Sequence, residues 1–187
     1  MELAKKLRLK IGQILLRKKL EKTIRKARYS DFSQVKKIGI IWDASRVQEF
    51  IHLTRFFQKM TENGIEVNVI SYFNGKSLPD QYTAIRYLAC IKREELTFFY
   101  LPMTNDAEQF IKNRFDILID LNFNELLPLK YLSGLSAASF KVGLSGNDRE
   151  GKVYDLMIDL KIPETGEFLD QTLHYLQMIH AETEVAH

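Results

Sequence analysis

Polar side chains stand at or just beyond the ends of several apolar, strand-like runs, where they could bind a metal or a small ligand. These candidate rim residues are Asp43, Ser45, Asp120, Asn122 and Asp159. The carboxyl ends of parallel strands share one edge of a sheet, and α/β ligand sites form there. Carboxylate oxygens suit Mg²⁺, and Lys141, near another run, could pair with the carboxylates. The alternative is that Asp43 caps a helix and the other groups are solvated or cap helices themselves.

No motif of a known cofactor site or catalytic centre accompanies these residues. The turn after the first apolar run reads Trp42-Asp43-Ala44-Ser45-Arg46 and lacks the glycines of a dinucleotide or phosphate-binding loop. A nucleophile elbow is absent, and no histidines have metal-ligand spacing. Cys90 lies in an apolar run, which favours an inert thiol. We therefore expect no cofactor, no metal and no catalytic residue, and favour a binding role over an enzymatic one.

The N-terminal 29 residues carry the strongest charge signal in the chain. They hold eleven Lys or Arg against two acids, a net charge of +9, whereas the other 158 residues hold 16 bases and 22 acids, a net charge of −6. Such a contrast indicates a basic arm on a mildly acidic body. We expect the arm to bind an anionic partner through these cations: Lys5, Lys6, Arg8, Lys10, Arg17, Lys18, Lys19, Lys22, Arg25, Lys26 and Arg28.

The composition of residues 2–28 predicts a basic amphipathic helix over residues 1–29, followed by a linker at 30–35. At about 100° per residue its apolar side chains fall into two stripes on roughly opposite sides. A long helix that touches two surfaces would explain this, and so would a break near residues 12–16. The first stripe is Leu3, Leu7, Ile11, Ile14 and Leu15, and the second is Leu16, Leu20, Ile24 and Ala27.

Three interpretations fit this basic amphipathic segment. RNA or a ribonucleoprotein is our leading expectation, because clustered cations neutralise phosphates without reading sequence. An anionic membrane surface fits the same pattern, although the segment's only aromatic residue is Tyr29. The third interpretation is a helix docked on its own acidic body, with its charges merely solvated.

Apolar runs and helical patterns alternate through residues 36–180. Runs at 36–42 and 66–71 flank a helical pattern that stops at Asn63-Gly64, which predicts a βαβ unit. Further strands are predicted at 87–91, 97–101, 115–121, 140–144 and 154–160, and helices at 105–113, 125–135 and 167–180. This alternation predicts one three-layer, Rossmann-like α/β domain with a mostly parallel sheet. We expect the tail at 181–187 to be frayed.

The longest apolar runs are too short to span a bilayer, and no secretory signal pattern is present. A single cysteine suits a reducing compartment. We therefore expect a cytoplasmic protein without a transmembrane segment.

The runs 115–121, 132–136 and 140–144 resemble the N-terminal Rossmann-like half of heptosyltransferase-type GT-B glycosyltransferases. This resemblance implies a fold and suggests an alternative role, a small-ligand or degenerate glycosyltransferase-like domain that uses the rim. The whole chain also resembles a family of small bacterial proteins of unknown function. That second likeness rests on the basic helix, the Ile40–Asp43 strand, the block 115–144 and the run 154–160, and it implies no activity.

Overall fold

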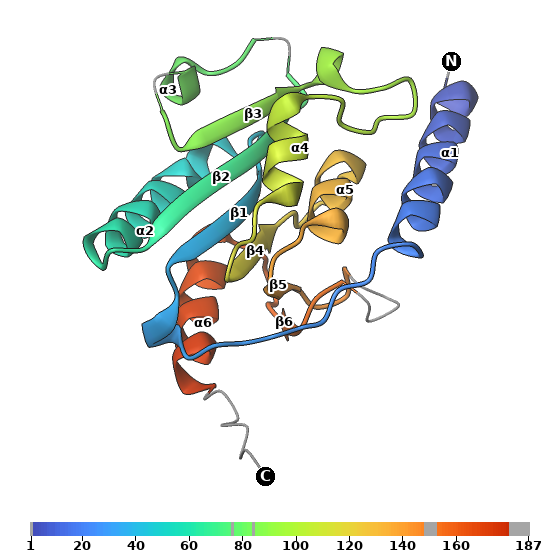
Figure 1. Ribbon diagram of the computed structural model, residues 1–187. Coiled ribbons are helices and arrows are strands. Elements are labelled where there is room, and N and C mark those ends of the chain that lie inside the picture. The colour runs from blue at the N-terminus through green and yellow to red at the C-terminus, as the bar shows by residue number, and fades with distance from the viewer. Residues whose placement is uncertain (1, 76, 84, 148–152, 180–187) are drawn as a thin grey trace.

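The computed structural model describes residues 2–75, 77–83, 85–147 and 153–179. Within them, six parallel strands form one sheet in the order β3-β2-β1-β4-β5-β6 (Figure 1). The predicted frayed tail lies outside the described residues. The strands are β1 (Lys37–Asp43), β2 (Glu66–Phe73), β3 (Leu88–Lys92), β4 (Ile117–Leu121), β5 (Phe140–Leu144) and β6 (Leu156–Ile158). The predicted Rossmann-like α/β class is confirmed, and the sheet is entirely parallel.

Helices cover both faces of the sheet (Figure 1). Residues of α2 and α6 share one apolar cluster with the sheet, and residues of α4 and α5 share another on the opposite face. Because both faces are covered, the central strands are buried along nearly their whole length, as parallel sheets require. The helices are α1 (Glu2–Leu20), α2 (Phe50–Glu62), α3 (Asp80–Thr83), α4 (Asn105–Lys112), α5 (Leu127–Leu135) and α6 (Thr165–Met178).

Local sequence signals explain several element boundaries. Gly64 has a φ of 74°, a conformation that glycine adopts without strain, and it ends α2 where the Asn63-Gly64 pair predicted. The Thr104 hydroxyl accepts a hydrogen bond from the amide of Ala107 at 3.1 Å and caps the first turn of α4. Pro128 stands in the first turn of α5, where its missing N–H costs nothing.

The N-terminal helix is shorter than predicted. It ends at Leu20 rather than at residue 29, and residues 23–30 cross the body without regular structure (Figure 1). Tertiary contacts explain the difference: the Arg25 guanidinium forms two hydrogen bonds with the carboxylate of Asp155, at 2.7 and 2.8 Å. The amide of Arg28 donates to the carbonyl of Ser139 at 3.0 Å. The predicted linker at 30–35 includes the short 3-10 helix η1 (Phe32–Gln34).

The strand predicted at 97–101 is also wrong, because these residues form a tight turn. The amide of Thr97 donates to the carbonyl of Leu101 at 2.8 Å, and Tyr100 has a φ of 63°. The turn packs against α1, where the Arg8 guanidinium lies 3.9 Å from the centre of the Phe98 ring. Tertiary packing has therefore overridden the strand propensity of this aromatic run.

Among the residues that the structure describes, no helix is both long and apolar enough to cross a membrane.

Candidate functional site

Four of the five predicted rim residues lie on or just after the two adjacent strands between which the strand order reverses. Asp43 ends β1 and Asp120 lies on the adjacent β4, which pairs with β1 through the Ile41 and Asp120 positions. Ser45 is the second residue after β1, and Asn122 directly follows β4. In open α/β sheets the crevice at such a reversal is the usual ligand site. The structure therefore places these four residues where a Rossmann-like fold binds its ligands.

The carboxylate of Asp43 is already occupied by protein donors. Its Oδ1 accepts hydrogen bonds from the amide of Ser45 at 3.0 Å and from the Ser45 hydroxyl at 2.5 Å. Its Oδ2 accepts one from Nδ2 of Asn124 at 2.8 Å, and the residue is 1% exposed. Asp43 does not cap α2, which begins later, at Phe50. It holds the turn after β1 closed through short local hydrogen bonds.

Asp120 is equally enclosed. Its Oδ1 accepts a hydrogen bond from the amide of Asn122 at 2.9 Å, and its Oδ2 accepts one from the Tyr154 hydroxyl at 2.5 Å. Burial raises the pKa of the Asp120 carboxyl above its ordinary value, and the hydrogen bond from Tyr154 opposes that rise only in part. Asn122 in turn bonds the amide and the carbonyl of Leu126 with its side chain and so positions the start of α5.

Asp159 stands apart from this cluster. It is exposed, follows the edge strand β6, and is separated from β4 by β5. Within the described residues it forms no hydrogen bond with another rim residue. No group of three or more His, Cys, Asp or Glu side chains in that part of the chain could hold a metal ion. The three carboxylates considered for Mg²⁺ are therefore not gathered into one site.

Lys141 is buried beneath the N-terminal segment and does not form an ion pair with the rim carboxylates. Its ammonium group donates to the carbonyls of Ser133 at 2.7 Å and Gly134 at 3.1 Å, at the C-terminal end of α5. These carbonyls have no partner within the helix, so Lys141 satisfies them. Burial, and secondarily the nearby charge of Arg25, lower the pKa of Lys141 to about 7.

Sequence reasoning missed three polar residues of this region. Tyr154 and Asn124 bond the two rim carboxylates, and Asn147 donates to the carbonyl of Asn122 at 3.0 Å. The two asparagines lie in the turns after β4 and β5. This position after a strand is the sequence feature from which both could have been predicted. Tyr154 gave none, because its hydroxyl reaches β4 only through the packing of its ring over Gly143.

The basic N-terminal segment, residues 2–28, docks on the body mainly through small and apolar contacts. Leu16 is buried with Leu127 of α5. Gly12 lies so close to the turn at 97–101 that an added Cβ would be 2.2 Å from the carbonyl oxygen of Phe99. The pair of Arg25 with Asp155 fixes the far end of the segment.

Five of the eleven cations of the segment have side-chain contacts. Arg8, Lys19 and Arg25 contact the body, while Lys6 and Arg17 pair with acids of the segment itself. Within the described residues, the other six have no hydrogen-bond acceptor or ion-pair partner for their side chains, and all six are exposed: Lys5, Lys10, Lys18, Lys22, Lys26 and Arg28.

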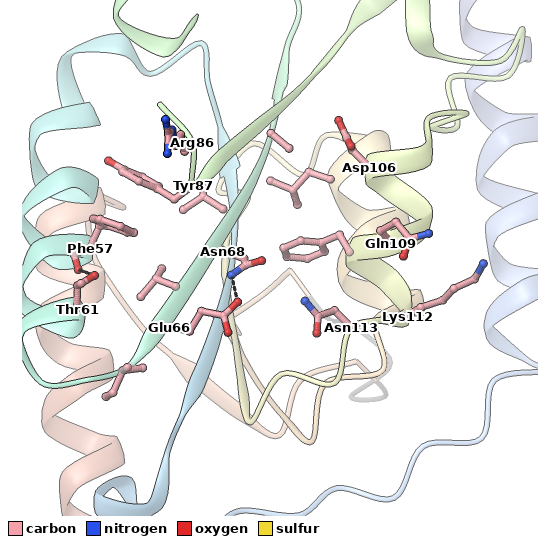
Figure 2. A pocket seen from close by; sticks show the side chains of 16 residues that line it. Phe57, Thr61, Glu66, Asn68, Arg86, Tyr87, Asp106, Gln109, Lys112 and Asn113 are labelled. Carbon is pink, nitrogen blue, oxygen red and sulfur yellow. Dashed lines mark hydrogen bonds between the residues drawn. The ribbon is translucent and has the colours of Figure 1, made fainter. Parts of the chain in front are cut away.

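A hollow of about 740 Å³ lies between α2 and α4, beside the part of β2 that β3 does not cover (Figure 2). The stacked rings of Phe57 and Tyr87, 3.6 Å apart, form one side of it, and Gln109 and Asn113 line the other. No rim residue and no cation of the N-terminal segment lines it. Its charged side chains have both signs, so it does not select an anion or a cation: Glu66, Arg86, Asp106 and Lys112.

Comparison with known proteins places the chain in a family without assigning an activity. No curated protein matches it. A family model described as a family of unknown function, DUF6913, matches residues 8–179, which include most of the basic segment and the whole sheet. The chain therefore belongs to this family.

Proposed function

We propose that the protein is a non-enzymatic binding protein whose basic N-terminal segment engages an anionic partner. The observation that carries this proposal is the group of six exposed cations without partners for their side chains in the described part of the chain. Unpaired surface cations attract polyanions over distances of about a Debye length, and this attraction weakens with salt.

The contacts of the segment argue against a purely internal role for its charge. The body carries a net charge of −6, yet Arg25 alone among the eleven cations forms an ion pair with a described residue of the body. Docking relies instead on Gly12, Leu16 and the contact of Arg8 with Phe98. Most of the positive charge is therefore not needed to hold the segment in place.

Two classes of partner fit this charge. RNA or a ribonucleoprotein is the partner expected from the sequence, since lysines and arginines neutralise phosphates and release counterions. An anionic membrane surface is the second, and one observation supports it: Leu3, Leu7 and Ile14 of α1 are exposed to solvent.

Retention on immobilised heparin, a sequence-independent polyanion, tests the proposal without assuming the class of partner. The variant replaces Lys5, Lys10, Lys18 and Lys22 with Gln, and a matched control replaces four exposed lysines of the body, Lys36, Lys59, Lys112 and Lys161. We expect the wild type and the control to elute at similar salt and the variant at much lower salt. Equal elution of all three proteins would refute the proposal.

A second candidate function is a small-ligand site at the rim, supported by the positions of Asp43 and Asp120 on the two adjacent strands at the strand reversal. It ranks below the first because protein donors already occupy both carboxylates. A rise in melting temperature with Mg²⁺ or a nucleotide sugar, seen for the wild type and lost in Asp43→Asn, would favour it. No rise in the wild type would exclude these ligands.

A further inference from the structure

Helix α1 has two apolar faces, and the body covers one of them. Gly12 and Leu16 face α5 and the turn at 97–101. Leu3, Leu7 and Ile14 are 82%, 59% and 47% exposed. At about 100° per residue these three side chains fall within a narrow sector, roughly opposite Gly12 and Leu16. We call Leu3, Leu7 and Ile14 the outer stripe.

The outer stripe is bordered by cations. Lys10 lies one helical turn beyond Leu7 and one turn before Ile14, and Lys18 lies one turn beyond Ile14. Neither lysine has an acceptor for its ammonium group among the described residues. Farther along the segment Ile24 is fully exposed and lies between the exposed cations Lys22 and Lys26. Exposed branched apolar side chains and lysines without acceptors among the described residues therefore alternate along the outer face of α1.

We infer that this surface lies on an anionic lipid bilayer, with the outer stripe inserted at the level of the headgroups and the body held behind the helix. The inference rests on the proposed function, because it names the anionic partner of the same segment. An apolar stripe bordered by lysines is the arrangement of helices that lie in the plane of a membrane interface. The long lysine stems extend toward the headgroup phosphates while the apolar side chains enter the acyl boundary.

The positions of the two faces favour a bilayer over a nucleic acid. A phosphate backbone is bound by cations and gains nothing from an exposed stripe of Leu and Ile. A bilayer removes that stripe from water, and each buried methylene strengthens binding. Because the covered face is roughly opposite the outer stripe, the body does not obstruct a flat surface in contact with Leu3, Leu7 and Ile14.

Sedimentation of the full-length protein with vesicles tests this inference. One set of vesicles is phosphatidylcholine, and the other contains equal parts of phosphatidylcholine and phosphatidylglycerol. The outer-stripe variant carries Leu3→Gln, Leu7→Gln and Ile14→Gln, which keep good helix formers and every cation. The control variant replaces three exposed apolar residues of the body, Ile51, Met157 and Ile162, with Gln.

We expect the wild type and the control to sediment with the anionic vesicles and not with the neutral ones. The outer-stripe variant should lose about tenfold or more in vesicle affinity, since several apolar side chains no longer leave water, while its heparin retention stays unchanged. A Leu7→Trp variant should shift its fluorescence to shorter wavelength on anionic vesicles. The native Trp42 is fully buried and should not contribute to that shift.

The outcomes separate the two proposals. Heparin retention without binding to anionic vesicles, or equal vesicle binding by the wild type and the outer-stripe variant, would overturn the bilayer and leave the anionic partner. Equal RNA affinity of the wild type and the outer-stripe variant would then identify nucleic acid as the partner. If the wild type is not retained on heparin, both the proposed function and the bilayer inference are refuted.

Discussion

The rim and the basic N-terminal segment differ in whether their polar groups already have partners. Asp43 and Asp120 are buried, and each accepts hydrogen bonds on both carboxylate oxygens. Lys10 and Lys18, in contrast, are exposed and without acceptors in the part of the chain that the structure describes. Buried polar groups need hydrogen-bond partners for the protein to fold, so the hydrogen bonds of the rim carboxylates stabilise the native structure. The exposed lysines, which have no such partner among the described residues, can bind another molecule.

The largest expected effect comes from the lysine that lies inside the protein. Lys141 is 1% exposed, and burial, together with Arg25, lowers its pKa to about 7 from an unfolded value near 10.5. Between these values the unfolded chain binds a proton that the native protein does not, so stability rises with pH. One pKa unit corresponds to about 1.4 kcal/mol. We therefore expect the wild type to gain a few kcal/mol over Lys141→Met between about pH 7 and pH 9.5.

Urea unfolding of the two proteins at a series of pH values measures this difference, because other titrating groups are common to both and cancel. Lys10→Met is the matched control, and its curve should run parallel to that of the wild type because its ammonium group is exposed. Parallel curves for Lys141→Met as well would mean that the amine is protonated throughout this range. Lys141 would then titrate like the exposed lysines, and the contrast between buried and exposed charged groups would not hold for this residue.

The second prediction concerns the rim itself. Asp43→Ala removes the acceptor of three hydrogen bonds and leaves the amide of Ser45 and the side chain of Asn124 without that partner. We expect a loss of about 3 kcal/mol in the free energy of unfolding, since buried donors without acceptors are costly. Asp159→Ala, at the exposed edge of the sheet, should cost less than about 0.5 kcal/mol. Thermal and urea unfolding check both values, and equal costs would show that Asp43 is not fixed in the turn.

The third prediction separates the docked face of α1 from its exposed face. In an isolated helix Gly12→Ala would be stabilising by about 1 kcal/mol. Here the new Cβ would lie 2.2 Å from the carbonyl oxygen of Phe99 and 2.8 Å from a methyl group of Leu127. The helix must shift outward, so we expect a net loss of about 1–2 kcal/mol and faster proteolysis within residues 2–28. Gln13→Ala, at an exposed neighbouring position, should change neither, and an unchanged Gly12→Ala would disprove the close docking.

The sequence predicts the fold well because the signals of the fold are local. The run at 140–144 is a strand because it is apolar and short, and Asn63-Gly64 stops a helix through its own backbone preferences. The rim was predictable from the topology alone, because strand ends in a parallel sheet share an edge. Asp159 does not lie with the other rim residues, because it follows a strand at the edge of the sheet. Hydrophobic periodicity does not reveal the position of a strand in the sheet.

Features that depend on contacts between distant residues were not predictable. The N-terminal helix ends early because Arg25 reaches Asp155, 130 positions along the chain. Nothing near Arg25 in the sequence distinguishes it from the cations that have no partner among the described residues. In the same way, two apolar stripes on one helix indicate two surfaces. Only the docking of Gly12 and Leu16 shows that the body covers one face and leaves the outer stripe exposed.

The smallest expected effect on stability completes the comparison. Replacing Lys5, Lys10, Lys18 and Lys22 with Gln removes four exposed charges that have no partners among the described residues. Gln is nearly as good a helix former as Lys, so the free energy of unfolding should change by less than about 0.5 kcal/mol. The same variant is expected to lose most of its heparin retention. Urea unfolding and salt elution of one preparation measure both quantities. A large loss of stability would mean that these charges hold the segment on the acidic body, and the separation between groups that fold the protein and groups that bind a partner would no longer stand.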